Sequence, residues 1–359
     1  MTRPLRICLI ASSRFPVAEP FAGGLEAHTH QLTTELIRRG HEVTLFAGPG
    51  SDEGLNTRIL NATPFAATAA ARNDVAAWPE AWMSEHHAYL TLMLELARTG
   101  TSDFDVVHNN SLHHLPIAMA TSIDLPMITT LHTPPIPWLE SAMQFAPPTS
   151  VFAAVSHATS NAWAQTIESR VVYNGIDTDR WAAGPGGGPA IWSGRLVPEK
   201  GPHLAIGAAL ASGIPLDLVG PIGDAAYFEN EIRPLLDDSI RYLGHLSYRD
   251  LVPVIGAASV AVVTPRWDEP YGLVAAEAMS CGTPVAAFAR GALRELIAPA
   301  AGRLARADDV ADLARAMLDA RTLDRAAVRA HAVDFCSLDS MADSYEALYR
   351  EMTTGAMAA

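Results

Sequence analysis

The chain has 359 residues, of which 49% are hydrophobic, and its formal net charge at pH 7 is -14. This length is enough for two domains with large cores, and the hydrophobic fraction argues against long disordered segments. The acidic balance disfavours nucleic acid and anionic membranes as partners, because both require clustered Lys and Arg.

The first half of the chain alternates short β-branched runs with helical patterns. The apolar runs occupy residues 5–11, 41–47, 105–108, 126–132, 151–156 and 170–174, and a helical pattern follows the first of them. Strands that are apolar on both faces are typical of a parallel sheet with helices on either side. We therefore expect an α/β, doubly wound, Rossmann-like N-terminal domain over residues 1–174.

The cysteines and the N-terminus indicate the cellular compartment in which the protein is expected. Cys8, Cys281 and Cys336 are widely spaced, so they suggest no disulfide framework and no zinc site. The first apolar run meets Arg14 too soon for a signal peptide, and no later segment holds about 18 mainly apolar residues. We expect a cytoplasmic protein that spans no membrane.

A stretch rich in Gly and Pro, WAAGPGGGPA at 181–190, divides the chain. Such a stretch holds no helix or strand, so we expect a hinge or linker over 175–188. A second alternating series, which includes a helix near 224–236, predicts another Rossmann-like domain over 189–336, facing the first across a cleft. Residues 337–359 predict a last helix that crosses back onto the N-terminal domain, with Ser337 as its N-cap. Ligands of such sheets bind outside the carboxyl ends of the strands, which places the site in the cleft.

The segment DEPYGLVAAEAMSCGTPVAA contains two glutamates, Glu269 and Glu277, separated by seven uncharged residues. It reads as a loop followed by a short helix that begins near Gly272 and Leu273. Free amides at that helix start can bind an anion, and a carboxylate on each side can hold hydroxyl groups. A nucleotide sugar matches this arrangement, because its diphosphate lies between the hydroxyl groups of a ribose and those of a hexose. Two isolated glutamates are more often solvent-exposed surface residues, so the rest of the chain has to support this interpretation.

Two cations and a glycine turn provide that support. Of the 25 Lys and Arg residues, one is a lysine, Lys200, which indicates a position that needs a compact ammonium. Arg195 and Lys200 lie on one strand–loop–helix connection and can clamp a diphosphate. The FAGGLEAH turn at 21–28 runs into a helix whose amides could reach the same phosphates.

Together, the motifs AGGLE, LHTP, VVYNGID, SGRLVPEKG and EPYGLVAAEAMSCGTPVAA resemble those of the retaining nucleotide-sugar glycosyltransferases of the GT-B fold (glycosyltransferase family 4, glycosyl transferases group 1). The resemblance spans the chain almost end to end, and the spaced pair of glutamates is the family's hallmark. It implies a retaining, metal-independent hexosyltransferase. The donor would be a nucleotide-diphosphate sugar, with UDP-hexose favoured, and no other cofactor is implied.

The resemblance also implies roles for individual residues. The implied catalytic residues are Glu269, Lys200, Arg195 and His132. The implied donor-binding residues are Gly24, Arg195, Lys200, Gly244, His245, Glu269, Gly272, Leu273 and Glu277. In this assignment Glu269 contacts the donor hexose and Glu277 the ribose. The base rests near Gly244 and His245, and Gly24 covers the diphosphate from the other domain.

One loop departs from the family pattern, and two motifs are misleading. In ARGALREL, Arg290 replaces the first glycine of a Gly-Gly pair, and Glu295 stands one residue further from Gly291 than the pattern requires. The donor contacts of this loop therefore stay open. The Asp-x-Asp pairs at 103–105 and 177–179 are better explained as turns than as metal ligands. With Arg195 and Lys200 supplying positive charge, no divalent ion is needed.

The acceptor is expected on the N-terminal domain, where Trp78, Trp82 and Trp138 could stack on a sugar, although such residues are more often packing. Residues 1–170 carry nine Arg and no Lys against fifteen Asp and Glu, which favours a small soluble acceptor such as a natural product or saccharide over a membrane lipid. The alternatives are the same chemistry on a lipid or cell-envelope polysaccharide, and a GT-B epimerase or phosphorylase. A sugar-binding module without activity is less favoured, since the clamp and both glutamates are intact. A nicotinamide oxidoreductase is disfavoured by the missing Gly-x-Gly-x-x-Gly.

Overall fold

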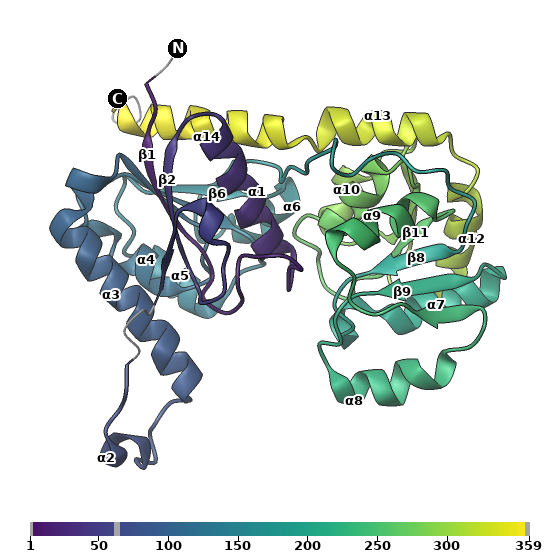
Figure 1. The fold of residues 1–359 in the computed structure, drawn as a ribbon, viewed down its shortest axis with the longest axis horizontal. Helices are drawn as coiled ribbons and strands as arrows, with labels where there is room; N and C mark the ends of the chain where they lie inside the picture. The colour runs from purple at the N-terminus through teal and green to yellow at the C-terminus, as the bar shows by residue number, and fades with distance from the viewer. Residues whose placement is uncertain (1–2, 61–64, 356–359) are drawn as a thin grey trace.

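The computed structural model describes residues 3–60 and 65–355, and each of its two lobes is built on one sheet (Figure 1). The N-terminal sheet has seven strands in the order β3-β2-β1-β4-β5-β6-β7, and the C-terminal sheet has six in the order β10-β9-β8-β11-β12-β13. All of these strand pairs are parallel. The strand order reverses beside β1 and beside β8, which is the doubly wound topology. The prediction of two α/β Rossmann-like domains is confirmed.

The strands lie close to the apolar runs of the sequence. The N-terminal strands are β1 (Arg6–Ile10), β2 (Glu42–Ala47), β3 (Thr57–Ile59), β4 (Val106–Asn109), β5 (Met127–Leu131), β6 (Val151–Ala154) and β7 (Arg170–Val171). The C-terminal strands are β8 (Ala190–Ser193), β9 (Leu216–Val219), β10 (Ile240–Tyr242), β11 (Ala261–Val263), β12 (Val285–Phe288) and β13 (Gly302–Ala305). The sequence pattern missed β3 and β13, because each is a short edge strand with polar, partly exposed residues.

Helices cover both faces of each sheet. Around the N-terminal sheet they are α1 (Gly24–Arg38), α3 (Glu80–Asp103), α4 (His114–Ala118), α5 (Pro137–Met143) and α6 (His157–Trp163). Around the C-terminal sheet they are α7 (Pro202–Ser212), α9 (Tyr248–Ala257), α10 (Leu273–Ser280), α11 (Leu293–Leu296), α12 (Val310–Ala320) and α13 (Arg325–Phe335). The single helix expected near 224–236 is instead α8 (Ala225–Tyr227) followed by a π turn and a 3-10 turn, since Pro234 has no amide to continue it. None of the described helices is both long enough and apolar enough to cross a bilayer.

Strand β1 shows why the sequence pattern is continuously apolar. Ile7 and Leu9 point to the face covered by α1, whereas Cys8 and Ile10 pack with residues of α3 on the other face. All four side chains are buried, because side chains of a strand alternate between two faces and here both faces are covered. The three cysteines are buried and free.

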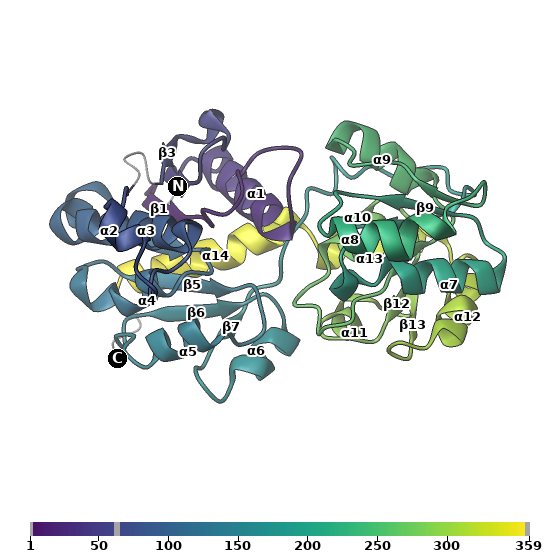
Figure 2. The ribbon, with the colours of Figure 1, turned by 90° about the horizontal axis from the view of Figure 1, so that it is seen from below.

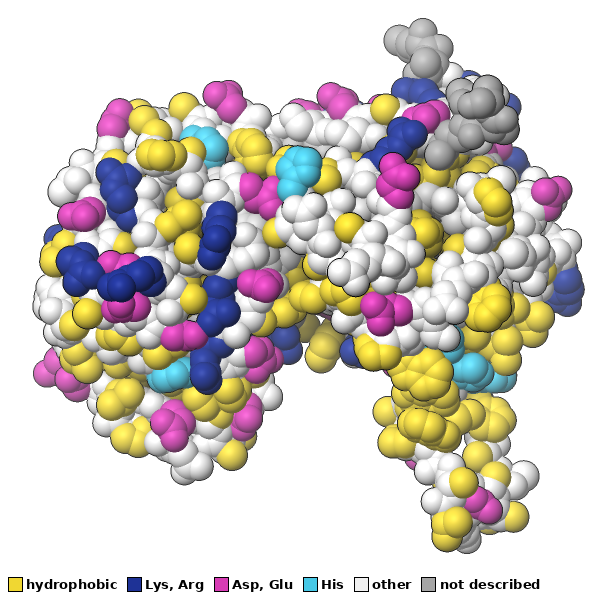
Figure 3. Space-filling model, turned by 180° about the vertical axis from the view of Figure 1, so that it is seen from behind, with side chains coloured by type: hydrophobic (Ala, Val, Ile, Leu, Met, Phe, Trp, Pro, Cys, Tyr) yellow, Lys and Arg dark blue, Asp and Glu magenta, His cyan; other side chains and the backbone are white. Residues whose placement is uncertain are grey.

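A narrow arm projects from the N-terminal lobe between β3 and α3, and it carries the short helix α2 (Ala69–Arg72) (Figure 1). Its described residues, 65–79, are almost all exposed. They include large apolar side chains at Phe65, Val75 and Trp78. Figure 3 shows hydrophobic side chains gathered on the arm and at its base.

Residues 181–189 of the Gly-rich segment form no helix or strand and Ala190 begins β8, but the segment is not a free linker. Backbone amides of Gly184, Gly186 and Gly188 donate to carbonyls around the end of α9 and the end of α10, over 2.8–3.0 Å. The Arg325 guanidinium donates to several carbonyls of the same region. The segment is therefore fastened to the C-terminal lobe, and the chain passes between the lobes near Ile176, which forms a bridge with Ser337.

The last helix, α14 (Leu338–Thr353), crosses back onto the N-terminal lobe (Figure 2). It begins after Ser337, whose hydroxyl accepts the amide of Ser340, so the predicted N-cap is present. Its apolar face is buried in the core beside β1 and β2. That face consists of Met341, Tyr345, Leu348, Tyr349 and Met352.

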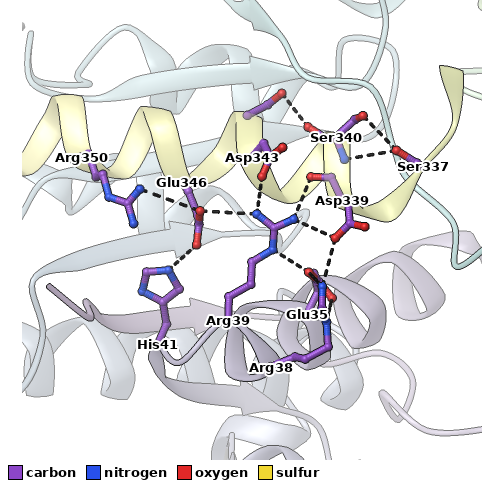
Figure 4. A network of polar contacts seen from close by, with 11 residues as sticks. Glu35, Arg38, Arg39, His41, Ser337, Asp339, Ser340, Asp343, Glu346 and Arg350 are labelled. Carbon is purple, nitrogen blue, oxygen red and sulfur yellow. Dashed lines mark hydrogen bonds and ion pairs between the residues drawn. The ribbon is translucent and has the colours of Figure 1, made fainter. Parts of the chain in front are cut away.

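A polar network fastens the solvent side of this contact (Figure 4). The Arg39 guanidinium at the end of α1 bonds Glu35 on its own helix and Asp339 on α14, the latter at 2.9 Å, and it also pairs with Asp343 and Glu346. His41 Nε2 lies 2.6 Å from a Glu346 carboxylate oxygen. The network joins the two ends of the chain, which are about 300 residues apart in sequence.

Candidate functional site

A cavity of about 460 Å³ lies between the two lobes. Most of its lining residues follow the carboxyl ends of strands: Ser12 after β1, His132 after β5, Arg195 after β8, Val219 at the end of β9 and Thr264 after β11. Loops at this edge of two facing sheets form the usual ligand crevice of doubly wound folds. The predicted position of the site is therefore occupied by a cavity of ligand size.

The predicted site residues converge on this cavity. It is lined by Gly24, His132, Arg195, Lys200, His245, Glu269, Gly272, Leu273 and Glu277. Gly244 does not line it. Its carbonyl accepts the Gly220 amide at 3.0 Å and its φ of 85° forms the turn that presents His245, so its place is structural.

The two cations are held differently. Lys200 Nζ lies 2.7 Å from Glu269 Oε2 and 5.2 Å from the centre of the Trp267 ring. Arg195 lines the cavity, and among the described residues it forms no hydrogen bond or ion pair. Its charge acts on Glu26 across the cleft, lowering a carboxyl pKa that burial raises above its ordinary value. One cation is therefore pre-positioned by a carboxylate, and the other is available for an anionic ligand.

The loop after Lys200 requires glycine. Gly201 has a φ of 63°, and a Cβ there would lie 2.4 Å from the Thr264 carbonyl oxygen. The Thr264 hydroxyl lies within hydrogen-bonding distance of the carbonyls of Lys200 and Gly201, at 3.0 and 2.9 Å. This close approach of two loops brings Lys200 beside the segment that carries Glu269.

Helix α10 begins at the cavity. Its N-cap is Gly272, with φ 101°, no side chain caps its first amides, and Gly272, Leu273 and Val274 line the cavity. Glu269 precedes these amides and Glu277 stands in the second turn. Burial raises the pKa of Glu277 to about 7. The carboxyls thus flank the helix start, as the spacing of the motif predicted.

The lobes approach each other at this helix start. A Cβ on Gly24, the first residue of α1, would lie only 3.0 Å from Leu273 Cδ1. A larger residue at position 24 would push the two lobes apart or displace Leu273. Gly24 of the N-terminal lobe therefore lies against the start of α10 in the C-terminal lobe. This is the side of the cleft on which the sequence analysis placed it.

His132 is half-buried at the end of β5. Its Nε2 lies 2.9 Å from Asn110 Oδ1, and its ring centre lies 4.9 Å from that of His28. Burial, together with His28 and His108, lowers its pKa well below the ordinary value, so the ring is neutral at pH 7. Since Oδ1 of an amide only accepts, the proton resides on Nε2, and Nδ1 is left as an acceptor.

Two aromatic residues that the sequence analysis did not assign, Trp181 and Tyr248, also line the cavity. Trp181 lies edge-on to Tyr248, with ring centres 4.8 Å apart, and the Arg180 guanidinium covers the same Tyr248 ring at 3.7 Å. Trp181 comes from the Gly-rich segment and Tyr248 from the start of α9. Neither position carries a local motif, so only the folded chain brings them together.

The divergent loop does not reach the cavity. The Glu295 carboxylate accepts the amides of His157 and Ala158, at 3.1 and 2.8 Å, and the hydroxyl of Tyr173 at 2.8 Å. These partners belong to the N-terminal lobe, so Glu295 links the lobes instead of binding a ligand. Gly291 keeps its role in the turn, because a Cβ there would lie 2.3 Å from the Glu269 carbonyl oxygen.

The Asp-x-Asp pair at 177–179 lies in a turn, as predicted, whereas in the pair at 103–105 Asp103 ends helix α3 and Asp105 directly precedes β4. Asp105 pairs with Arg6 at 2.8 Å, and Asp177 Oδ1 accepts the amides of Asp179 and Arg180. Neither pair lines the cavity. Within residues 3–60 and 65–355, one group of three possible metal ligands was found, and it consists of His86, His113 and His114, outside the cavity.

Known proteins share both the sequence and the fold. Residues 22–180 match the model of glycosyltransferase family 4, and residues 186–330 match that of glycosyl transferases group 1. Glycogen synthase of Mycobacterium tuberculosis is 30% identical over 338 residues, which cover 82% of this chain and 80% of that protein. A D-inositol 3-phosphate glycosyltransferase of Mycolicibacterium smegmatis is 26% identical, with coverage of 96% and 90%.

Among solved structures, sucrose-phosphate synthase of Thermosynechococcus elongatus superposes with a TM-score of 0.78, at 21% identity and with 98% and 100% of the two chains covered. Anabaena Alr3699/HepE in complex with UDP-glucose superposes with a TM-score of 0.72, at 19% identity and with 96% and 99% covered. These likenesses show the GT-B fold. With the family matches and the cavity described above, they establish that this chain belongs to the family 4, group 1 glycosyltransferases.

Proposed function

We propose that this glycosyltransferase moves a hexose from a nucleotide-diphosphate sugar to a hydroxyl group of a small soluble acceptor, with retention and without a divalent metal. The observation that carries the proposal is the arrangement of Arg195 and the Lys200–Glu269 pair around the start of α10, inside an interlobe cavity. Two cations and a helix N-terminus suit a diphosphate, and the flanking carboxyls suit the hydroxyl groups on either side of it.

In the proposed reaction the sugar departs as a cation-like centre while negative charge builds on the diphosphate. Arg195, Lys200 and the α10 amides stabilise that charge in a cleft that excludes water. Retention follows if the acceptor hydroxyl attacks from the side that the diphosphate leaves, with a phosphate oxygen taking its proton. This route needs no protein nucleophile.

The remaining residues position the donor. Glu269 holds the hexose hydroxyls and Glu277 the ribose hydroxyls. The Nδ1 atom of the neutral His132 ring serves as a hydrogen-bond acceptor near the reacting face of the donor sugar. Gly24 leaves space for the diphosphate beneath α1. The base would lie toward His245, Trp181 and Tyr248, which line the same cavity.

UDP-hexose is the favoured donor, since a neighbour with the same fold was solved with UDP-glucose. The relatives act on different acceptors by their names, so the acceptor of this chain is proposed from its own surface. The acidic N-terminal half favours a natural product or a saccharide over a lipid at an anionic membrane. A cytoplasmic location is proposed with it.

A thermal-shift screen against UDP-, GDP- and ADP-sugars tests the donor. A ligand at about 100 times its Kd stabilises a protein by about 2.7 kcal/mol, so the correct donor should raise Tm in a concentration-dependent way. Release of free nucleotide only when an acceptor is added would separate a transferase from an epimerase or a phosphorylase. Absence of any shift with every sugar nucleotide would contradict the proposal.

A further inference from the structure

A second group of rings lies on the N-terminal lobe, beside the cavity. It consists of Trp78, Trp82, His86, His114 and Trp138, and we call it the aromatic platform. The ring centres of Trp82 lie 4.9 Å from Trp78, 5.4 Å from His86 and 6.5 Å from Trp138, and those of His114 and Trp138 are 5.2 Å apart. The residues come from the arm and from α3, α4 and α5, and Figure 3 shows hydrophobic and histidine side chains gathered at the base of the arm.

The platform is open to solvent. Trp78 is 57% exposed and Trp138 is 54% exposed. Packing in a core does not explain indole rings that are more than half in water, and a contiguous exposed aromatic surface marks a binding site. The rings stack on one another, so they present a pre-ordered surface to a ligand.

Polar atoms converge beside these rings. His86 Nδ1 is buried and has no hydrogen-bond partner. His113, stacked on His114 at 4.4 Å, accepts the Leu115 amide through Nδ1, so the neutral ring carries its proton on Nε2. The site thus has a histidine nitrogen without a partner in His86 and a ring donor in His113, which are groups of the kind that bind a hydroxyl group.

The charge of the site points to a neutral ligand. Burial, with His114 and His86 nearby, lowers the pKa of His113 to about 3, and burial also lowers the pKa of His114. Both rings are therefore uncharged at pH 7. Arg14, whose charge also acts on His113, is paired with Glu85 at 3.4 Å.

The platform is linked to the cavity through residues that are adjacent in the chain. Leu112 and Arg14 both line the cavity, and Leu112 directly precedes His113 and His114 at the start of α4. A ligand that rests on the platform can extend past Leu112 toward His132. It would approach the proposed donor from the opposite lobe.

We propose that the aromatic platform binds the acceptor, and that this acceptor is a saccharide whose pyranose rings stack on Trp78 and Trp138. The proposal rests on the proposed transferase function. A pyranose has apolar C–H faces for indole rings and equatorial hydroxyls for His86 and His113. An anionic membrane is disfavoured, because the nearby cation is already paired.

A three-histidine metal site fits the same residues less well. Metal ligation by His113 Nε2 needs a lone pair there, while Nδ1 already uses its lone pair to accept the Leu115 amide. A neutral imidazole has one lone pair of this kind. Binding a metal would therefore break the cap of α4.

Tryptophan fluorescence tests the site directly. We would titrate the full chain with maltotetraose and with cellotetraose, and expect at least one of them to change the emission saturably. Trp78→Ala and Trp138→Ala should each weaken binding of that probe by about tenfold, the upper range for loss of one aromatic contact. Leu318→Ala, an exposed apolar residue on α12 of the other lobe, is the matched control and should bind as the parent does. In transfer assays the same probe should serve as acceptor, with the loss seen in its KM.

Three outcomes would overturn the proposal. They are no response to either saccharide, unchanged affinity in both Trp variants, or a probe that binds but neither serves as acceptor nor competes with one. The donor screen distinguishes failure of the platform proposal from failure of the proposed transferase function. Saccharide binding that depends on Trp78 and Trp138 without any sugar-nucleotide shift would keep the platform as a saccharide site and contradict the transferase.

Discussion

Lys200 and Glu269 are 69 residues apart in sequence, yet Nζ of one lies 2.7 Å from Oε2 of the other. Lys200 follows β8 and Glu269 follows β11, and these strands are neighbours in the C-terminal sheet. Because neighbouring parallel strands end at the same edge, their following loops meet. The carboxylate holds the ammonium at the cavity wall, in place for an anionic ligand.

Removal of either cation should therefore slow the reaction. Lys200→Ala and Arg195→Ala should each lower kcat by about 10²–10³, because each removes a group that stabilises the charge developing on the diphosphate. Steady-state kinetics with the donor found in the thermal-shift screen measures this. Lys200→Arg should not restore full activity, since a planar guanidinium does not replace a compact ammonium paired to Glu269.

Arg315→Ala supplies the control for these variants. Arg315 lies on α12 with its side chain 61% exposed and pairs only with Asp312 within the described residues. Its loss should leave kcat unchanged. Near-normal turnover in both Lys200→Ala and Arg195→Ala would remove the clamp from the mechanism.

Activity should persist after exhaustive dialysis against a chelator. Arg195, Lys200 and the α10 amides supply the positive charge at the diphosphate, and neither Asp-x-Asp pair lines the cavity. Added Mg²⁺ or Mn²⁺ should change the initial rate by no more than about twofold, whereas a required metal contributes several kcal/mol. A strict requirement for either ion would contradict this prediction.

Glu277 should make the stability of the ligand-free protein depend on pH. Burial raises the pKa of its carboxyl from 4.5 to about 7. The folded state then holds this proton more tightly than the unfolded state, so stability falls as pH rises from about 4.5 to about 7 and stays lower above it. Glu277→Gln cannot ionise, and it should be more stable than the parent by up to about 3 kcal/mol at pH 8, with a smaller difference at pH 5. Thermal unfolding across this pH range measures the difference in stability between Glu277→Gln and the parent. A difference that does not change with pH would argue against a raised pKa of Glu277.

Arg39 should be the main polar anchor of α14. Arg39→Met removes the guanidinium that joins Glu35 on α1 to α14, although Glu35 keeps its pair with Arg38 and Glu346 keeps His41 and Arg350. We expect the free energy of unfolding to fall by about 2 kcal/mol, because charged hydrogen bonds across the contact are lost, and amides of residues 338–353 to exchange faster. Arg350→Met is the matched control, since Arg350 is 35% exposed and lies 3.8 Å from Glu346, and its loss should cost less than about 1 kcal/mol. Equal destabilisation by the two changes would assign the effect to the Glu346 contact alone.

The sequence predicted most of the fold, and where it failed the reasons are local. Helix α3 was not predicted although its buried positions Ala88, Leu92, Leu96 and their neighbours repeat at helical spacing, so that signal was available. Strands β3 and β13 had no such signal, since edge strands with partly exposed residues lack an apolar run. The helix expected near 224–236 was wrong in form, because its apolar pattern continues past a proline that breaks it.

By itself, the sequence determined the two α/β domains, the helix that begins after Ser337, and the segment from Glu269 to Glu277 at the start of a helix. These features depend on residue spacing within one strand or helix, and this spacing can be read directly from the sequence. Only the tertiary structure decided which of the spaced residues meet. It set Lys200 against Glu269, brought Gly24 to Leu273, added Trp181 and Tyr248 to the cavity, and turned Glu295 toward α6. Contacts of this kind depend on how separate elements are placed in space, and no local pattern contains that placement.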